Sequence, residues 1–329
     1  MAISPASHST LSIEINLTAV IMAVKADEPV VYASSLGADL PPGLPSGPFD
    51  PLNHRTLELG LRGFAQDQAG LDLGYVEQLY TFGDRGRNVL DGSAGALPSP
   101  HIVSIGYLAL TRIFPGATDP SNFLPLYAYF PWEDWRGGKP ALLDRDILPA
   151  LTQWGEEAEP EHSGDRRALS RKERIALHFG SDGLPFDEEK VLERYELLYD
   201  AGLVEEAIRD RHKPAAPLPV QLGATMAFDH RRILATALGR IRGKLKYRPV
   251  IFEMMPETFT LTDLQRKVEA ISGHHLHKQN FRRLVETGGL VEPTGGQTTT
   301  GGRPAALFRF RREVLTERPA PGLRLGRGT

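Results

Sequence analysis

Cysteine is absent from this sequence of 329 residues. Disulfide bonds, thiolate zinc sites, iron–sulfur clusters and a cysteine nucleophile are therefore excluded, and a reducing compartment suits such a chain. No stretch of about 18 apolar residues occurs, so the sequence predicts no transmembrane helix. The first residues lack a charged segment followed by an apolar core, and we expect no secretory signal. These absences favour a protein of the cytoplasm that does not contact a membrane.

The composition that is present is that of a globular protein. Hydrophobic residues make up 41% and charged residues 24% of the chain, which is enough for one large core or two moderate ones. The net charge of −3 conceals an asymmetry, because residues 228–329 contain 19 Lys+Arg and 9 Asp+Glu, whereas the rest contains 19 and 32. A basic end on an acidic body is typical of a nucleic-acid-binding module joined to another domain. A basic tail without a partner is the alternative.

Residues 11–138 combine strands with one helix. Apolar, strand-like runs occur at 13–24, 30–34, 76–82, 101–110 and 123–130. Residues 56–69 have apolar positions at helical spacing, and Gly70 is suited to end that helix. Strands that alternate with a helix predict a mixed sheet covered by helices. The following residues, 139–217, are expected to form a helical insertion, in which Ser170 and Glu173 have the spacing of a capping box, Asp187 is suited to cap a further helix, and the proline-rich stretch 213–219 acts as a hinge.

Residues 218–312 have the element order of a winged helix-turn-helix domain. We expect a helix over 230–245, a second after Thr260 with Asp263 in its capping box, and a third over 278–287. A strand at 290–293, a Gly-rich loop and a strand at 305–310 follow. Residues 313–329 are rich in Pro, Gly and Arg and are expected to be disordered. The predicted fold class is thus α+β, with a mixed-sheet domain, a helical insertion and a C-terminal winged helix.

In a winged helix, the third helix enters the major groove of DNA. Here Phe281, Leu284 and Val285 are expected to pack inward. The side chains expected to face DNA are those of Lys278, Gln279, Asn280, Arg282 and Arg283, with Thr294, Gln297 and Arg303 in the loop. These residue types form the usual contacts with base edges and phosphates, and a Gly-rich loop with an arginine suits phosphate or minor-groove contact. The alternative is a solvated basic helix face with a flexible hairpin.

The stretch LPSGPFDPLNHRTLELGLRGFAQDQAGL (44–71) resembles the signature of Nudix domains, in which several carboxylates hold Mg²⁺ against a pyrophosphate. When the two are aligned on Gly70, the Arg-Glu pair of the signature is replaced by Gly63-Phe64 and the Glu-Glu pair by Asp67-Gln68. At most one carboxylate of the metal cluster is present, so we assign no catalytic or metal-binding residue. An amphipathic helix in an unrelated domain is the alternative.

The phrases MAFDH, NFRR, EPTG and GGRPAALFRF occur in this order between residues 226 and 310. They resemble the C-terminal part of Nudix-related regulators of NAD metabolism, NrtR and its longer relative NadQ, and the insertion at 139–217 favours NadQ. The resemblance covers residues 225–310 closely and 11–110 more loosely. It implies a homodimer that represses NAD-biosynthesis genes by binding double-stranded operator DNA. It also implies an effector, ATP, NAD or a nicotinamide-related metabolite, and no required cofactor.

The same resemblance implies a nucleotide pocket along residues 82–110. Arg85 and Arg87 are candidates for phosphate binding, and Phe82, Tyr107 or Trp132 for stacking on a base. Solvated arginines and core aromatics are the alternative. His230, His274, His275 and His277 are expected to cap and solvate helix ends rather than to bind a metal.

Two other functions stay open. The first is an active Nudix pyrophosphohydrolase of ADP-ribose or dinucleotides with an accessory basic domain, which the depleted carboxylates disfavour. The second is a non-catalytic nucleotide-binding adaptor whose basic domain contacts protein, which the outward Arg282 and Arg283 disfavour. For a regulator, we expect a ligand to change the spacing of two winged helices through the hinge at 213–219, by binding the two conformations with different affinity.

Overall fold

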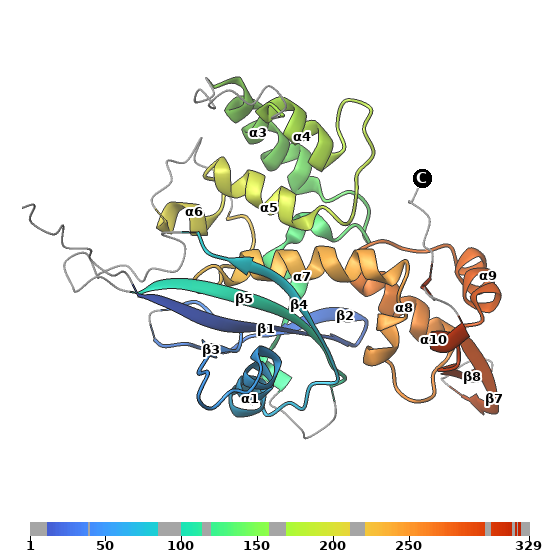
Figure 1. Cartoon of the computed structure of the whole chain (residues 1–329). Helices are drawn as coiled ribbons and strands as arrows, with labels where there is room; N and C mark the ends of the chain where they lie inside the picture. Colours follow the sequence, from blue (N-terminus) through green and yellow to red (C-terminus); the bar gives the residue numbers. More distant parts are fainter. Residues whose placement is uncertain are drawn as a thin grey trace, which may run out of the picture.

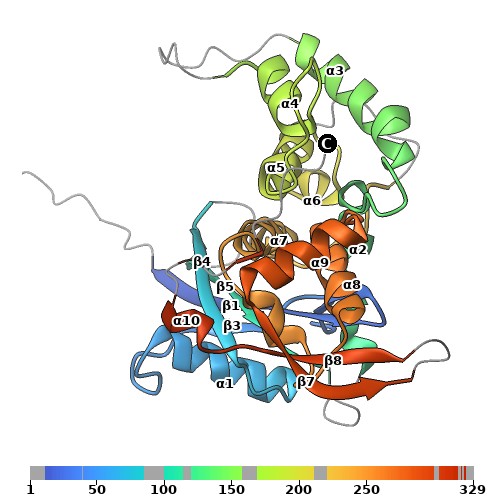
Figure 2. The same ribbon diagram turned by 90° about the vertical axis from the view of Figure 1, so that its right-hand side faces the viewer.

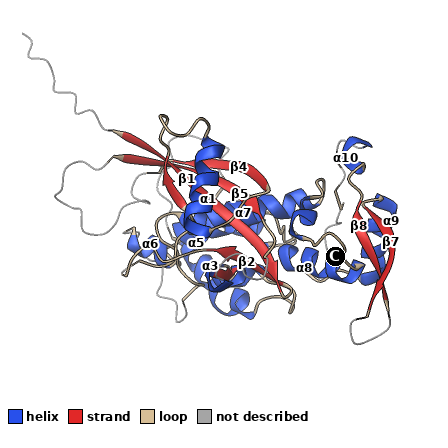
Figure 3. Cartoon of the chain, turned by 90° about the horizontal axis from the view of Figure 1, so that it is seen from below, coloured by secondary structure: helices blue, strands red, loops and turns tan. Residues whose placement is uncertain are grey.

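The structure is a computed structural model of the chain, and it describes residues 12–38, 40–84, 100–113, 120–157, 169–210, 221–299, 304–317, 320 and 322–323. Figure 1 shows the layers in order: helix α1 (Leu57–Ala69), a mixed sheet, helix α7 (His230–Leu245), and above it the helices α3 to α6 of residues 148–209. Residues 261–310, which form helices α8 (Leu261–Ser272) and α9 (Lys278–Gly288) and strands β7 (Val291–Thr298) and β8 (Ala305–Phe310), lie at one end of this stack. Figure 3, the view from below, shows that this end projects away from the sheet.

The sheet has six strands in the order β4-β5-β1-β2-β6, and β3 pairs with β1 beside this path. The strands are β1 (Ile13–Lys25), β2 (Glu28–Tyr32), β3 (Ser46–Pro48), β4 (Tyr75–Phe82), β5 (His101–Leu110) and β6 (Phe123–Pro125). Strands β1 and β5 run parallel, and the other pairs are antiparallel. Residues 17–24 of β1 are buried on both faces of the sheet, which is why this strand reads as a continuous apolar run.

Helix α1 (Leu57–Ala69) covers one face of the sheet, as the sequence predicted. The Thr56 side chain accepts a hydrogen bond from the Leu59 N–H at the first turn, and Gly70 ends the helix with φ of 64°. This left-handed conformation favours glycine. Leu61 and Ala65 are fully buried in a core with β1 and β5 residues.

Helix α7 (His230–Leu245) covers the opposite face. The predicted stripe of Leu234, Leu238 and Ile241 is fully buried. The sequence had grouped this helix with the winged helix, but in the structure it contacts β1, β4, β5 and α5 as well as α8. Gly106 of β5 allows the close approach, because a Cβ atom there would lie 2.9 Å from Ile233 Cγ2. Helix α7 is therefore a core helix of the body.

The insertion stacks on α7. Its helices are α3 (Leu148–Glu156), preceded by a π-helical turn at Leu143–Ile147, then α4 (Arg171–Phe179), α5 (Val191–Asp200) and α6 (Glu205–Arg209). The capping box of Ser170 and Glu173 is confirmed at the start of α4. Helix α5 begins without a side-chain cap, because the Asp187 carboxylate accepts the Glu189 N–H in the preceding turn, at 3.1 Å. The predicted cap at Asp187 is therefore wrong.

The C-terminal end has the winged-helix order (Figure 2). Its elements are a 3-10 helix at Val250–Met254, α8 (Leu261–Ser272), α9 (Lys278–Gly288), β7 (Val291–Thr298), β8 (Ala305–Phe310) and α10 (Val314–Glu317). The capping box of Thr260 and Asp263 is confirmed at α8. Strands β7 and β8 pair as an antiparallel hairpin, and Phe308 of β8 also bridges to Phe259, just before α8.

Two expectations about local structure differ from what is observed. The run 123–130 is a strand only over Phe123–Pro125, and the next four residues form helix α2 (Leu126–Tyr129). This turn lets Tyr127 enter the core and donate from its hydroxyl to the Ala270 carbonyl, 2.7 Å away. The tail, expected to be disordered, contains α10, whose Val314 is fully buried.

Among the described residues, no helix has the length and apolarity needed to cross a bilayer.

Candidate functional site

Helix α9 presents a polar, mostly basic face at the projecting end of the molecule. Phe281 and Val285 are buried, and because they lie four residues apart they fix the rotation of the helix. Leu284 is partly buried, and the five side chains predicted to point outward are all exposed: Lys278, Gln279, Asn280, Arg282 and Arg283. The predicted orientation is therefore observed, whereas the contact of this face with DNA stays a prediction.

The cations of this face have no carboxylate partner within the described residues. No ion pair there involves Lys278, Arg282 or Arg283. By contrast, Arg309 of the neighbouring strand β8 lies 2.6 Å from the Glu292 carboxylate. Three cations without a local counterion are suited to an anionic partner, because binding costs no existing ion pair.

The turn before α9 is built by one carboxylate. Glu269 accepts the Leu276 N–H at 2.9 Å, and its other oxygen lies 3.1 Å from His275 Nδ1. Burial alone would raise the pKa of Glu269, but hydrogen bonds from the Leu276 N–H, Gln265 and His275 hold that pKa below its usual value.

In the described part of the chain, no three His, Asp or Glu side chains are placed to hold a metal ion.

The hairpin beside α9 corresponds to the predicted wing. Thr294 and Gln297 are exposed on β7. The Thr294 hydroxyl donates to the Leu307 carbonyl at 3.1 Å and accepts the Gly296 N–H at 3.2 Å. Gly295, between them, has φ of 79°, a conformation that favours glycine. Arg303, the third candidate, lies outside the described residues.

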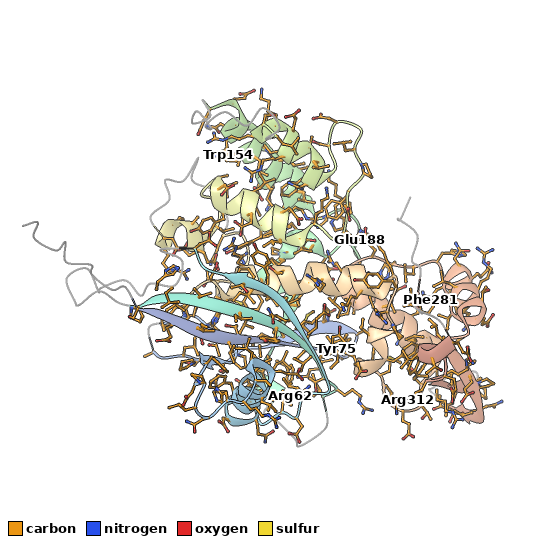
Figure 4. All side chains as sticks on the ribbon, viewed as in Figure 1. Arg62, Tyr75, Trp154, Glu188, Phe281 and Arg312 are labelled. Carbon is orange, nitrogen blue, oxygen red and sulfur yellow. The ribbon has the colours of Figure 1, made fainter. Side chains whose placement is uncertain are left out.

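Three polar side chains of α1, those of Glu58, Arg62 and Gln68, have structural partners. Gln68 forms two hydrogen bonds with the backbone of Ser46 in β3, one accepted at 3.0 Å and one donated at 2.8 Å. Glu58 pairs with Arg62 at 2.8 Å, and Arg62 also donates to the Gly74 carbonyl at 3.2 Å. These contacts attach α1 to β3 and to the loop before β4, on the lower layer seen in Figure 4.

The predicted ligand-binding residues do not come together. Phe82 is buried on the sheet face covered by α7, where the Arg232 guanidinium lies 5.3 Å from its ring centre. Trp132 is fully buried in the same core. Tyr107 belongs to the opposite core, on the α1 side, so it cannot line one pocket with Phe82 in this conformation. Arg85 and Arg87 lie outside the described residues.

Sequence reasoning missed a buried ionic cluster that joins three parts of the molecule. Glu133 is fully buried and lies 2.6 Å from Arg194 of α5 and 2.7 Å from Arg242 of α7. Arg242 also donates to the Ile271 carbonyl of α8 at 3.1 Å. Burial would raise the pKa of Glu133, but the two guanidinium groups hold it below its usual value. The sequence feature that could have indicated this cluster is Arg242, which directly follows Ile241 of the apolar stripe of α7.

The helices on either side of the predicted hinge are in direct contact. Residues 213–219 lie outside the described residues, but they connect α6 to α7, and both helices belong to the body. The two helices are also joined directly, because Arg231 lies 3.0 Å from Glu206 and both are buried, and Arg209 donates to the Phe228 carbonyl at 2.7 Å. The hinge itself therefore stays a prediction, and the helices on either side of it both pack in the body.

A cavity of about 660 Å³ lies between the end of β5, the 3-10 helix at Val250–Met254, the hairpin and α10. Phe252 and Phe310 line it with their rings stacked 4.3 Å apart. Arg112, Arg309 and Arg312 contribute positive charge, and glutamates of the same segments contribute negative charge. Figure 4 labels Arg312 at this position. Of the predicted ligand-binding residues, the three that the structure describes, Phe82, Tyr107 and Trp132, do not line this cavity.

Comparison with known proteins supports the assignment of the C-terminal end. Residues 251–310 match the model of the NrtR DNA-binding winged helix domain. The ADPR responsive transcriptional repressor NtrR of Acinetobacter baylyi is 40% identical over 99 residues, which are 30% of this chain and 40% of the relative. The matched part thus spans less than half of that relative's length.

Solved structures extend the likeness to the whole fold. The crystal structure of Shewanella oneidensis NrtR complexed with a 27mer DNA matches with a TM-score of 0.53 and 18% identity, over 92% of this chain and 95% of that one. A further structure of NrtR from the same organism matches with a TM-score of 0.52 and 19% identity, over 91% and 95%. The α+β fold class and the resemblance to NrtR are therefore confirmed.

Proposed function

Since residues 251–310 form an NrtR-type DNA-binding winged helix, we propose that the chain is a ligand-responsive transcriptional repressor of NAD-biosynthesis genes. It binds operator DNA through α9 and the β7–β8 hairpin as a homodimer. The observation that supports this most is the face of α9, on which three cations and two amide side chains are exposed while Phe281 and Val285 fix the helix in place. Arginine and amide side chains at such positions read base edges, and lysine contacts phosphate.

The effector is a nucleotide or a related metabolite. A relative at 40% identity over 99 residues is called ADPR responsive, which adds ADP-ribose to ATP, NAD and nicotinamide-related compounds as candidates. That name belongs to the relative, and the matched residues cover only 40% of it. Binding is therefore tested directly, by the change in melting temperature of the full chain with each compound. A saturating ligand at 100 times its Kd stabilises the folded state by about 2.7 kcal/mol.

We propose that the body does not hydrolyse pyrophosphates. The positions that would carry the signature carboxylates offer Asp67 alone, Gln68 is engaged with Ser46, and Glu58 is paired with Arg62. In the Nudix signature several carboxylates hold Mg²⁺, and a single carboxylate such as that of Asp67 is a weaker anchor than such a cluster. Incubation with ADP-ribose or dinucleotides and Mg²⁺ should give no turnover, and sustained release of products would instead support the hydrolase.

DNA binding is tested with a labelled duplex from the promoter of an NAD-biosynthesis operon and a random duplex of equal length. We expect the promoter duplex to bind at least 1,000 times more tightly, the lower end for specific recognition. A plot of the logarithm of the DNA-binding constant against the logarithm of the salt concentration has a negative slope. Lys278→Ala should reduce the magnitude of that slope by about one, because it removes one phosphate contact. Arg283→Ala should also reduce the preference for the promoter sequence.

Arg55→Ala is the matched control, because Arg55 is exposed at the start of α1, on a different layer of the molecule from α9 (Figure 1). It should change neither the affinity nor the salt slope. Equal binding of the promoter and random duplexes at moderate salt would contradict the proposed function. So would an Arg55→Ala effect as large as that of Lys278→Ala, since α9 would then not be the binding face.

A further inference from the structure

The segment 186–190 of the insertion, called the brace here, runs from the loop after α4 into α5. It follows the C-terminal half of α7 closely, because α7 has glycines where the brace passes. A Cβ atom at Gly239 would lie 2.6 Å from the Glu189 carbonyl oxygen, and one at Gly243 would lie 2.8 Å from Glu189 Oε2. Lys246 at the end of α7 pairs with Glu188 at 2.9 Å, and Figure 4 places Glu188 beside this end of the helix. The brace is thus held against α7 by backbone contact and by charge.

The first residue of the brace reaches the turn between α8 and α9. The Phe186 ring lies 4.4 Å from the Trp135 ring, and Trp135 stacks on His274 at 5.7 Å with 24° between the ring planes. The centres of the Phe186 and His274 rings are 6.3 Å apart. The Arg194 guanidinium also lies over the Phe186 ring, 4.1 Å from its centre. A ring of the insertion, one of the body and one of the turn therefore form a single aromatic cluster.

The backbone of the turn is fixed to the same place. Gly273 ends α8 with φ of 76°, and its carbonyl accepts the Trp135 N–H at 2.7 Å. A Cβ atom at Gly273 would lie 2.5 Å from the Glu133 carbonyl oxygen. The turn therefore has no room to move closer to Glu133, and the aromatic cluster contacts it through the His274 ring. Because α9 begins five residues after Gly273, the direction of α9 depends on how this turn is held.

We propose that the brace is what the helical insertion contributes to DNA recognition: Phe186 is a positioning residue that sets the angle of α9 through Trp135 and His274. The predicted loss of specific DNA binding rests on the proposed function. The placement of the turn does not, because it can be measured without DNA. Loss of the Phe186 ring leaves the cations of α9 in place but lets the turn move. Specific binding, which needs an accurate angle in the groove, then falls more than binding to random sequence, which needs only charge.

The test compares Phe186→Ala with Trp154→Ala in the full chain. Trp154 is a buried aromatic of the same insertion, packed under Arg171 at 4.2 Å, and Figure 4 places it at the far end of the insertion from α9. Phe186→Ala should weaken promoter binding about tenfold, with the affinity for the random duplex within twofold of the parent and the salt slope unchanged. Trp154→Ala should leave promoter binding within twofold, and Phe186→Leu should restore most of it.

Hydrogen exchange without DNA separates this proposal from the proposed function. In Phe186→Ala, the hydrogen-bonded amides within residues 274–283, such as those of Leu276 and Phe281, should exchange at least tenfold faster than in the parent, while those of the sheet are unchanged. Unchanged exchange at 274–283 would contradict the proposed role of Phe186. So would a loss of promoter binding in Trp154→Ala as large as the loss in Phe186→Ala. If the parent chain does not bind the promoter at all, the proposed function fails, and the exchange experiment still decides whether the brace holds the turn.

Discussion

Replacing Glu133 by glutamine should destabilise the fold by about 3–5 kcal/mol, the usual cost of breaking a buried ion pair from one side. Glu133 accepts three charge-assisted hydrogen bonds, from Arg194 Nε at 2.6 Å, Arg194 Nη2 at 2.8 Å and Arg242 Nη1 at 2.7 Å. Each is worth about 1.5–3 kcal/mol. Glutamine keeps the shape, but its NH₂ group then faces N–H donors, and two guanidinium groups stay buried without an anion.

The free energy of unfolding can be measured by urea denaturation followed by tryptophan fluorescence, since Trp132 and Trp135 flank the cluster. Glu58→Gln is the control. Its pair with Arg62 is half exposed, with 51% of the Glu58 side chain accessible, so we expect a loss of no more than about 0.5 kcal/mol.

A double-mutant cycle with Arg194→Met completes the experiment. The double variant should be more stable than the two separate losses predict, by at least about 1 kcal/mol, because Arg194 has no carboxylate to pair with once Glu133 is gone. A loss below 1 kcal/mol for Glu133→Gln, or simple additivity in the cycle, would refute the reasoning that this cluster is a coupled, desolvated network.

Three further predictions concern single residues. Burial lowers the pKa of His230 to about 3. Between pH 6.5 and 3 only the unfolded state binds the extra proton, so the free energy of unfolding decreases as the pH is lowered, by up to about 1.4 kcal/mol per pH unit. His230→Asn, whose side-chain oxygen can accept the Leu44 N–H, should show a smaller difference in urea midpoint between pH 7 and 5, and a difference equal to that of the parent would contradict this. Gly273→Ala should lower the melting temperature much more than Gly295→Ala, because both have positive φ but only Gly273 would place its Cβ against backbone. Thr260→Ala should cost about 1 kcal/mol through loss of the α8 cap, measured by urea denaturation, and a neutral result would remove the capping box from the account.

The sequence predicted local structure well where one physical signal dominates. The bounds of β5, α7 and β8 follow from the spacing of apolar residues along the sequence. The two capping boxes follow from side chains that accept hydrogen bonds from backbone N–H groups within three residues. The run after Phe123 was misread, because apolar residues in a short segment do not distinguish a strand from a buried helical turn. Asp187 was misread because an aspartate before a helix caps a turn as readily as the helix itself.

The candidate site divides in the same way. The outward face of α9 could be predicted from one helix, since Phe281 and Val285 decide which side is buried. The ligand pocket could not, because it depends on which sheet face each residue occupies. Phe82 and Tyr107 belong to different strands, and their faces are set by a register that shifts between Gln78 and Thr81 of β4.

By itself, the sequence determined β5, α7, β8 and the capping boxes, the basic end and the orientation of α9, because helix period, capping and charge act over a few residues. Only the tertiary structure decided that α7 is a core helix, that Glu133 joins the insertion to the body and to α8, and that Phe186 reaches the turn before α9. Those contacts join residues that are far apart along the chain. Their partners are selected by the packing of whole layers, and no local pattern encodes that packing.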